Sequence, residues 1–362
     1  MFAGSLRQTL LKISGLTTAG SLGYLAWNYS SGFGRVNCEA MEVDTTRTPR
    51  PTKSISGVLK DNQDFHLTLY QYQTCPFCSK VRAYMDYYGL SYDVVEVNPL
   101  FRGETKFSPY RRVPFLLFND NKDPRKHELL LPDSSLIVSL LQTSLLRSQT
   151  TKPELQRMLD FYPEQKLVVN GKEKQDYANK YYVMYEEEQG KQASEKIKTE
   201  AQWRKWVDET LVHTLSPNIY QSPGEAMRTF KYLSEAGEWD KNFPAWQIPI
   251  VIYVGAISMY VIGKRLKKRH HLKDDVRISL YEACDEWVTA VGNKKFLGGD
   301  QPNLADLASY GVLSAIEGCD AFGDVKMHTR ILPWFNRMKN VVNDHQGASQ
   351  LNIISKKAVA AA

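Results

Sequence analysis

The chain has 362 residues, of which 43% are hydrophobic and 24% charged, and this length allows about two domains plus appendages. Its five cysteines suit a reducing compartment and argue against a disulfide-stapled secreted protein. The formal net charge is +6, but the run 264–273 holds six cations and no acid, so the rest is close to neutral and a general nucleic-acid-binding protein is not expected.

The N-terminal segment carries no acidic residue before Glu39, and residues 13–27 are apolar and rich in small side chains. This stretch is shorter than the roughly 20 residues of a spanning helix, although its flanks extend it. We predict a membrane anchor over 1–34, with a mitochondrial transit peptide as the alternative. Residues 35–62, rich in Thr, Pro, Ser and Arg, are predicted to form a flexible, cleavable tether.

A thioredoxin/glutaredoxin-like α/β domain is predicted over 63–146. Alternating or apolar runs predict strands, and stretches without Pro or Gly predict helices. The expected order is a strand at 67–70, a helix at 79–88, strands at 92–97, 115–118 and 127–131, and a helix at 136–145. This order is that of a thioredoxin-like domain.

Cys75 and Cys78 form a Cys-Pro-Phe-Cys motif where the first strand meets the first helix. The first sulfur then lies at a helix N-terminus, where free N–H groups and the helix dipole stabilise a thiolate. We therefore predict Cys75 as the nucleophile and Cys78 as a less exposed, secondary thiol. A structural zinc site needs a second ligand pair, but Cys38, Cys284 and Cys319 are isolated, so no metal site is predicted.

Two further segments suit a peptide-like ligand. Pro114 opens a strand after a long loop, where a cis peptide bond would turn the backbone of Val113 toward the thiol. Asp133 and Ser134 stand at a helix N-terminus whose amides suit a carboxylate, although alone they would be a plain N-cap. Together with Cys75, these residues predict a glutathione site.

The rest of the chain is predicted to be helical. Residues 147–200 form a linker with helices, 201–344 an all-helical domain and 345–362 a tail. The linker carries tyrosines at helical spacing, which are expected to pack: Tyr177, Tyr181, Tyr182 and Tyr185. The next helix is expected to bury one face, made of Trp203, Trp206, Val207, Thr210 and Leu211.

Three further patterns occur within this helical domain. Residues 211–218, which contain Ser216, are expected to lead from a helix into a loop. Residues 248–262 predict a buried core helix rather than a membrane span, and the basic run after them a solvated helix end, with anionic lipid as an alternative contact. Asn303 and Asp306 predict a capping box. The helix that they start should bury Leu304, Leu307, Ala308, Gly311, Val312 and Ala315.

A thioredoxin-like domain followed by an all-α domain with an internal capping box resembles the glutathione transferase superfamily. Within it, the sequence resembles the type-2 prostaglandin E synthase family. The resemblance is carried by residues 72–78, 112–114, 133–135, 216–218, 264–267 and 302–307, and it covers roughly 56–344. It implies an intramolecular oxidoreductase that isomerises prostaglandin H2 to prostaglandin E2, with Cys75 catalytic and glutathione held by Val113, Asp133 and Ser134.

The resemblance also implies further site residues and ligands. Tyr72 and Phe77 line the pocket, with Pro114 and Ser216 as further substrate-pocket residues. Tyr72 would act as a second catalytic residue by hydrogen bonding an oxyanion, or else only pack at the strand end. Haem binding together with glutathione is implied and associated with endoperoxide breakdown, although the sequence shows no axial-ligand motif.

The expected mechanism is attack of the Cys75 thiolate on the oxygen at C9, followed by loss of the C9 proton; a glutathione thiol is the alternative attacking group. The expected setting is a homodimer anchored by its N-terminal segment in the Golgi membrane, with a cleaved cytoplasmic form, or else in the mitochondrion. Two other functions stay open: a glutaredoxin- or transferase-like thiol oxidoreductase, and a non-catalytic membrane protein that binds haem or glutathione.

Overall fold

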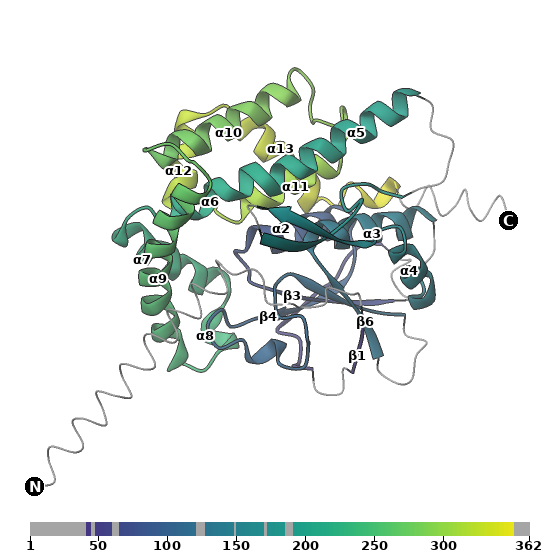
Figure 1. The fold of residues 1–362 in the computed structure, drawn as a ribbon, viewed down its shortest axis with the longest axis horizontal. Helices are drawn as coiled ribbons and strands as arrows, with labels where there is room; N and C mark the ends of the chain where they lie inside the picture. The colour runs from purple at the N-terminus through teal and green to yellow at the C-terminus, as the bar shows by residue number, and fades with distance from the viewer. Residues whose placement is uncertain are drawn as a thin grey trace, which may run out of the picture.

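The computed structural model describes residues 41–44, 48–59, 65–120, 127–147, 150–169, 172–184 and 191–350. The predicted N-terminal anchor, Cys38, Tyr185 and the end of the predicted tail lie outside these residues. In the described part, a mixed β-sheet with two covering helices lies beside a group of helices from the second half of the chain (Figure 1).

The sheet has six strands in the order β1-β6-β5-β3-β4-β2. Strands β3 and β4 are parallel, because helix α2 (Pro76–Tyr87) connects them, and the other pairs are antiparallel. With helix α3 (Ser134–Arg147) after the last strand, this is the thioredoxin-like fold that the sequence predicts. The strands are β1 (Met41–Asp44), β2 (Lys53–Ile55), β3 (His66–Gln71), β4 (Tyr92–Glu96), β5 (Phe115–Asn119) and β6 (His127–Pro132).

Both edge strands come from the segment predicted to be a flexible tether, so that prediction is wrong for them. β1 pairs with β6, where Val43 is buried, and β2 pairs with β4, where the Thr52 hydroxyl donates to the carbonyl of Val94. Strands this short gain their stability from the sheet that they join rather than from their own residues. Because the sequences of these strands are short and largely polar, they could not be predicted from the sequence.

Irregular chain covers the sheet face opposite α2 and α3. Residues 98–112, with the short helix η2 (Gly103–Thr105), bring Phe107 and Tyr110 against this face. Phe107 lies 5.5 Å from Tyr70, and Tyr110 lies 6.3 Å from Phe115, between ring centroids. This loop leads into Pro114, so its packing fixes the backbone that faces the cysteine motif.

The predicted linker is not all helical. Helix α4 (Lys152–Leu159) is followed by an antiparallel hairpin of β7 (Glu164–Val169) and β8 (Lys172–Tyr177). The charged sequence of β8 lacks the alternation that marks a strand, which is why the sequence did not predict it. Tyr177 is buried at the end of β8, while Tyr181 and Tyr182 lie in the turn after it rather than on a helix.

Helices make up the second half of the chain. They are α5 (Lys191–Trp206), the π-helical turn η3 (Val207–Leu211), α6 (Val212–Ile219), α7 (Pro223–Ala236), α8 (Trp239–Asn242), α9 (Gln247–Arg269), α10 (Val276–Val291), α11 (Leu304–Ser314), α12 (Asp320–His328) and α13 (Leu332–Asn343). The π turn shifts the helical phase, which leaves Thr210 exposed instead of on the predicted apolar face. Pro217 lies inside α6, so residues 212–219 are helical and the predicted loop is wrong.

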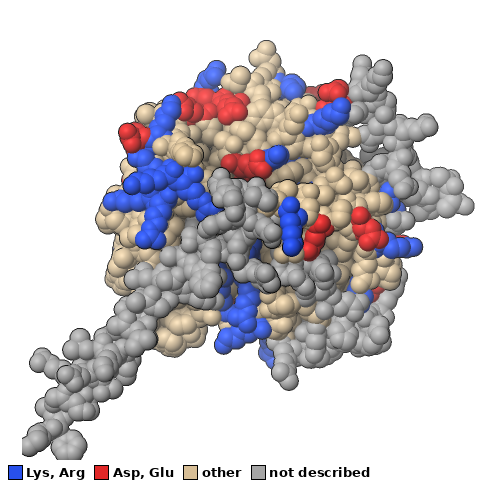
Figure 2. Space-filling view, in the orientation of Figure 1, with Lys and Arg blue, Asp and Glu red and all other residues tan. Residues whose placement is uncertain are grey.

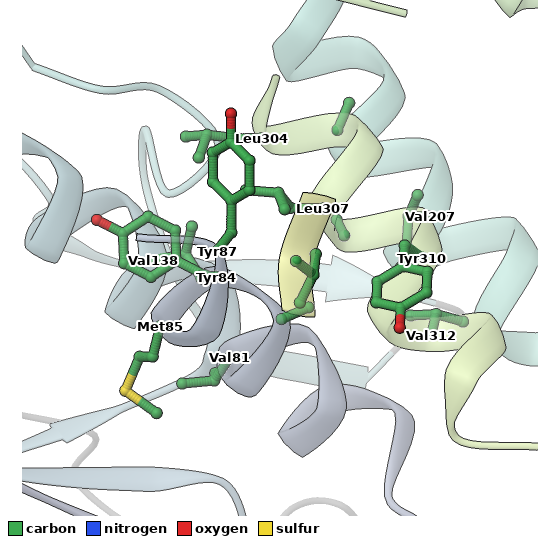
Figure 3. Close-up of a cluster of buried hydrophobic side chains, with 14 of the residues drawn as sticks. Val81, Tyr84, Met85, Tyr87, Val138, Val207, Leu304, Leu307, Tyr310 and Val312 are labelled. Atoms are coloured by element: carbon green, nitrogen blue, oxygen red, sulfur yellow. The ribbon is translucent and has the colours of Figure 1, made fainter. Parts of the chain in front are cut away.

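Helix α11 packs along α2 and joins the two halves in one core. Leu304 and Leu307 of α11 lie beside the ring of Tyr87 on α2, whereas Val312 lies on the other side of α11, near Val207 of η3 (Figure 3). The predicted capping box is present, because the side chains of Asn303 and Asp306 both make the expected bonds to backbone N–H groups. The predicted apolar stripe of α11 is buried throughout.

Helix α9 is not the buried core helix predicted for 248–262. One face packs on α7 and α6 through Val251, Ala256 and Ile262, but apolar side chains on the other face are exposed. It is also long and apolar enough to cross a membrane by length and composition, with 28% of its most apolar window buried. Hydropathy alone could not distinguish a buried core helix from a helix with one exposed apolar face.

Candidate functional site

Cys75 is the N-cap residue of α2, at the end of the loop that follows β3. The hydrogen bond from the Cys78 thiol, the N–H groups of Cys78 and Phe77, and the charge of Arg82 lower the pKa of Cys75, although burial opposes them. Burial raises the pKa of Cys78 well above that of a free thiol. The structure therefore favours a thiolate on Cys75, which is partly exposed, over one on the buried Cys78.

A polar network beneath the motif holds this loop in place. The Arg82 guanidinium donates to the side chain of Gln71 and, at 2.5 Å, to the carbonyl of Gln73. The carboxylate of Glu96, at the end of β4, accepts from the Gln73 N–H at 2.8 Å and from the Gln71 amide at 3.2 Å. Burial raises the pKa of Glu96 to about 7.

Sequence reasoning did not find this network because its members form no contiguous motif. Two features of the sequence could have indicated the network: Glu96 ends a largely apolar strand, and Arg82 lies inside the first helix. Buried charged residues are rarely found without partners. Glu96 and Arg82 are therefore the charged residues that hold the cysteine loop through Gln71 and Gln73.

Tyr72 lies just before the motif, and its side chain packs, like Val113 and Phe107, against the cluster of buried residues around Tyr70 and Phe115 on the sheet face opposite α2. Its hydroxyl is buried, and within the described residues it lacks a hydrogen bond of good geometry. Burial raises the pKa of Tyr72 to about 12, while Arg102 lowers it and the two cysteines raise it further. Tyr72 is thus a neutral hydroxyl donor whose hydrogen bond is left for a ligand to accept.

The peptide bond between Val113 and Pro114 is cis, as predicted. Val113 is partly exposed at the surface of the cluster that contains Tyr72, while Pro114 is buried. Phe77 is also partly exposed and packs on the large core, with the ammonium of Lys80 5.6 Å from its ring centre. Val113 thus packs on the same cluster as Tyr72, which precedes the motif, while Phe77 of the motif itself packs on the opposite, larger core.

Asp133 acts as the cap of α3 in this structure. One carboxylate oxygen accepts from the N–H groups of Ser135 and Leu136, and the other pairs with Lys180 at 3.1 Å. Burial raises the pKa of Asp133, but Lys180 and Lys80 together bring it down to about 2. Its carboxylate is committed to these partners, so the plain cap left open by the sequence describes Asp133 better than a direct ligand contact.

Ser134 and Ser216 lie in different parts of the molecule. Ser134 is buried in the first turn of α3. Ser216 is on α6, where its carbonyl accepts from Tyr220 at 3.2 Å and Gly263 of α9 approaches it. Because α6 packs mainly on α9, α10 and η3, the role of Ser216 in the substrate pocket stays a prediction.

A buried cation that the sequence did not reveal lies one turn into α2. The Lys80 ammonium contacts the hydroxyl of Ser135 at 2.8 Å and the carboxylate of Asp208 at 2.6 Å. The Ser135 hydroxyl in turn donates to Asp208 at 2.7 Å. This triad joins α2, α3 and η3 behind the motif, so it fixes the helix that carries Cys75.

His and Cys side chains are the usual protein ligands of transition metals and haem. Over the described ranges, no group of three His, Cys, Asp or Glu side chains could hold a metal ion. His66 pairs with Asp93, and His213 stacks on His270 with ring centres 3.9 Å apart. Haem iron takes one or two axial ligands rather than three, so haem binding stays a prediction.

The comparisons with known proteins fit this geometry. The family model for the glutathione S-transferase N-terminal domain matches residues 69–144, from β3 to α3. Prostaglandin E synthase 2 of Mus musculus is 45% identical over 296 residues, which cover 80% of this chain and 74% of that protein. The chain belongs to the prostaglandin E synthase 2 family. Prostaglandin E synthase 2 of Danio rerio is 44% identical over 281 residues, covering 76% of this chain and 71% of that protein.

This membership confirms the resemblance found in the sequence, and with it the expectation of an enzyme. Solved glutathione transferases match the chain at low similarity. The apo form of glutathione S-transferase III is 13% identical, with a TM-score of 0.41, over 78% of this chain and 96% of its own. Rice GST1 in complex with glutathione is 14% identical, with a TM-score of 0.40, over 81% of this chain and 98% of its own.

Proposed function

We propose that this member of the prostaglandin E synthase 2 family isomerises prostaglandin H2 to prostaglandin E2 at Cys75. The observation that carries the proposal is the juxtaposition of a thiol with a lowered pKa and a buried hydroxyl whose proton has no acceptor among the described residues. The thiolate supplies a nucleophile, and the hydroxyl of Tyr72 supplies a proton donor.

In the first step, the Cys75 thiolate attacks the endoperoxide oxygen on C9. A sulfur–oxygen bond forms, the oxygen–oxygen bond breaks, and its electron pair stays on the oxygen at C11. Tyr72 donates its proton to that oxygen, which becomes the C11 hydroxyl. A phenol whose pKa is raised to about 12 is protonated at neutral pH, so it enters this step as a donor.

In the second step, the phenolate of Tyr72 takes the proton from C9. The electrons of the carbon–hydrogen bond form the C9 ketone, the sulfur–oxygen bond breaks, and the thiolate of Cys75 leaves. Cys75 and Tyr72 return to their starting states, so the reaction has no net redox change and needs no reductant. The low pKa of Cys75 helps here as well, because a stable thiolate is a good leaving group.

We include glutathione as the cofactor of this site. The backbone of Val113 beside the cis bond and the first turn of α3 at Ser134 are the groups that would hold it. When bound, glutathione supplies a second thiol. The match to the transferase N-terminal domain supports this proposal. From the sequence, we also propose that residues 1–34 anchor the protein in the Golgi membrane and that the protein forms a homodimer.

The test is turnover of prostaglandin H2 by the purified full chain with glutathione, measured against the spontaneous rate. We expect Cys75→Ser to abolish formation of prostaglandin E2, and Tyr72→Phe to reduce it by roughly 100-fold, as for loss of one acid–base group. Cys78→Ser is the matched thiol control and should keep most turnover.

A thiol oxidoreductase that uses both cysteines is the competing function. It predicts that Cys78→Ser loses reduction of protein disulfides as fully as Cys75→Ser does. If both variants instead lost isomerase activity equally, the mechanism with one cysteine would be wrong. If the unmodified enzyme did not exceed the spontaneous rate, the isomerase proposal itself would fail.

A further inference from the structure

Helix α9 carries an apolar stripe on the surface of the protein. Residues of this stripe are between 39% and 61% exposed, which is unusual for large apolar side chains in a row: Trp246, Ile250, Tyr253, Ile257 and Val261. Phe101 extends it, because its ring meets that of Trp246 edge to face at 5.5 Å and is 41% exposed. The stripe includes Trp and Tyr, the residues enriched where membranes meet water.

The stripe ends in cations on the same side of the helix. At about 100° per residue, the five apolar positions together with Lys264 and Lys268 fall within an arc of about 80°. Lys264 and Lys268 are exposed, as are Arg265 and Arg269, and none of these four makes an ion pair within the described ranges. Figure 2 shows Lys and Arg side chains gathered on the flank where Figure 1 places α6 and α9.

A cavity of about 960 Å³ lies at this cationic end, between α9, α6 and the start of α10. Lys264, Lys268 and His271 are among its lining residues, together with Asp274 and Asp275. The two acids already have partners: Asp274 pairs at 3.2 Å with Lys267, which also lines the cavity, and Asp275 caps α10. The lysines are therefore the charges that the cavity offers to a ligand.

We propose that α9 is a membrane-docking surface that binds a bilayer containing anionic phospholipid, with the apolar stripe at the acyl boundary and the lysines on headgroups. Charge decides the choice of partner. Helix α9 contains no acidic residue, so a second copy of the stripe would bring no counter-charge to the lysines. An anionic bilayer offers both an apolar phase and negative charge, which is the combination that interfacial helices recognise. This surface is distinct from the predicted N-terminal anchor and from the chemistry at Cys75.

The test uses the full chain and vesicles of phosphatidylcholine, with or without phosphatidylserine, in which the lipid tails are brominated. Quenching of Trp246 is obtained as the difference between the unmodified chain and Trp246→Phe, so binding through other segments cancels. We expect quenching only with phosphatidylserine. Lys264→Gln with Lys268→Gln should weaken the partitioning responsible for this quenching by about 25-fold, at roughly fivefold per charge, and Ile257→Asp should abolish it.

Met327→Asp is the matched control, because Met327 is an exposed apolar residue on α12, outside the stripe. It should leave the quenching unchanged, and thermal melting should show that all variants are folded. Absence of Trp246 quenching in every vesicle would overturn the proposal. A dimer that Ile257→Asp dissociates while quenching persists would also overturn it, because a second copy would then cover the stripe. Shielding of Trp246 from aqueous iodide without vesicles would overturn it too, because another segment of the chain would then cover the stripe.

Discussion

At the scale of residues, the two thiols of the motif are made different by their surroundings. Both lie at the start of one helix, yet only Cys75 gains more from hydrogen bonds and the Arg82 charge than it loses by burial. Cys78 is buried and donates its hydrogen bond to Cys75. The second cysteine therefore serves the first as a donor, which fits a mechanism with one nucleophilic sulfur.

Cys78→Ala should raise the pKa of Cys75, because the thiol hydrogen bond is the largest single influence that lowers it. Cys78→Ser keeps a donor and should change it little. The rate of alkylation by iodoacetamide as a function of pH measures this pKa directly. An alanine variant with the same profile as the serine variant would show that backbone groups alone set the reactivity.

Glu96 should make stability depend on pH. Burial raises its folded-state pKa to about 7 from an ordinary 4.5, so the folded protein holds the proton more tightly than the unfolded chain. This contribution is complete below pH 4.5 and is lost as the pH rises through 7, by up to about 3 kcal/mol. Glu96→Gln should remove this part of the profile in urea unfolding at pH 5 and pH 8. Glu209→Gln, exposed on η3, is the control, and an equal effect of both would refute the assignment.

At the scale of elements, the contact of α2 with α11 positions the reactive thiol. Gly311 lies against the backbone of α2, where an added Cβ would stand 2.5 Å from the Lys80 Cα and 2.8 Å from the Ser79 carbonyl oxygen. Backbone atoms cannot turn away as a side chain can. The absence of a side chain at Gly311 therefore sets how closely the helical half approaches the cysteine helix.

Gly311→Ala should cost about 1–3 kcal/mol in unfolding free energy, as overpacked cores do, and should alter the alkylation rate of Cys75. Gly323→Ala is a matched control, because its Cβ would meet open space on α12. That change should stabilise the helix by about 0.5–1 kcal/mol. Equal unfolding energies for the two variants would show that α11 can shift freely along α2.

The elements also show what the sequence can predict. Three predicted features follow local rules, and all are present: the motif at the start of α2, the capping box of α11, and the order of strands and helices from β3 to α3. The edge strands β1 and β2, the charged hairpin and the exposed face of α9 were missed because each depends on what packs beside it. The site follows the same division, since the cysteines stand in a motif while Glu96 and Lys80 meet their partners only in the folded chain.

At the scale of the whole molecule, one hydrophobic core runs through both halves. The same cluster of buried residues includes Leu69 of the sheet, Val81 of α2, Trp287 of α10 and Trp334 of α13. Polar groups cross this boundary as well, since Lys80 of α2 meets Asp208 of η3. We therefore expect the described part of the chain to unfold as one cooperative unit rather than as two domains.

The buried pair of Lys80 and Asp208 tests this coupling. Lys80→Met leaves an unpaired buried carboxylate, and Asp208→Leu leaves an unpaired buried ammonium, so each should cost about 3–5 kcal/mol. The double variant removes both charges and should recover most of that loss. Urea unfolding followed by tryptophan fluorescence reports on the helical half, because Trp203 and Trp206 lie near η3.

Alkylation of Cys78, which is buried in the folded protein, reports on the sheet half, and the two transitions should coincide in every variant. Single variants whose costs simply add in the double would mean that the pair does not interact, because coupled neighbours deviate from additivity. In the alternative outcome, the two transitions separate in the single variants and coincide again in the double variant. That result would instead show that this one ion pair carries much of the cooperativity between the cysteine helix and the helical half. Because the Ser135 hydroxyl bonds both partners, Ser135→Ala should weaken the coupling without abolishing it.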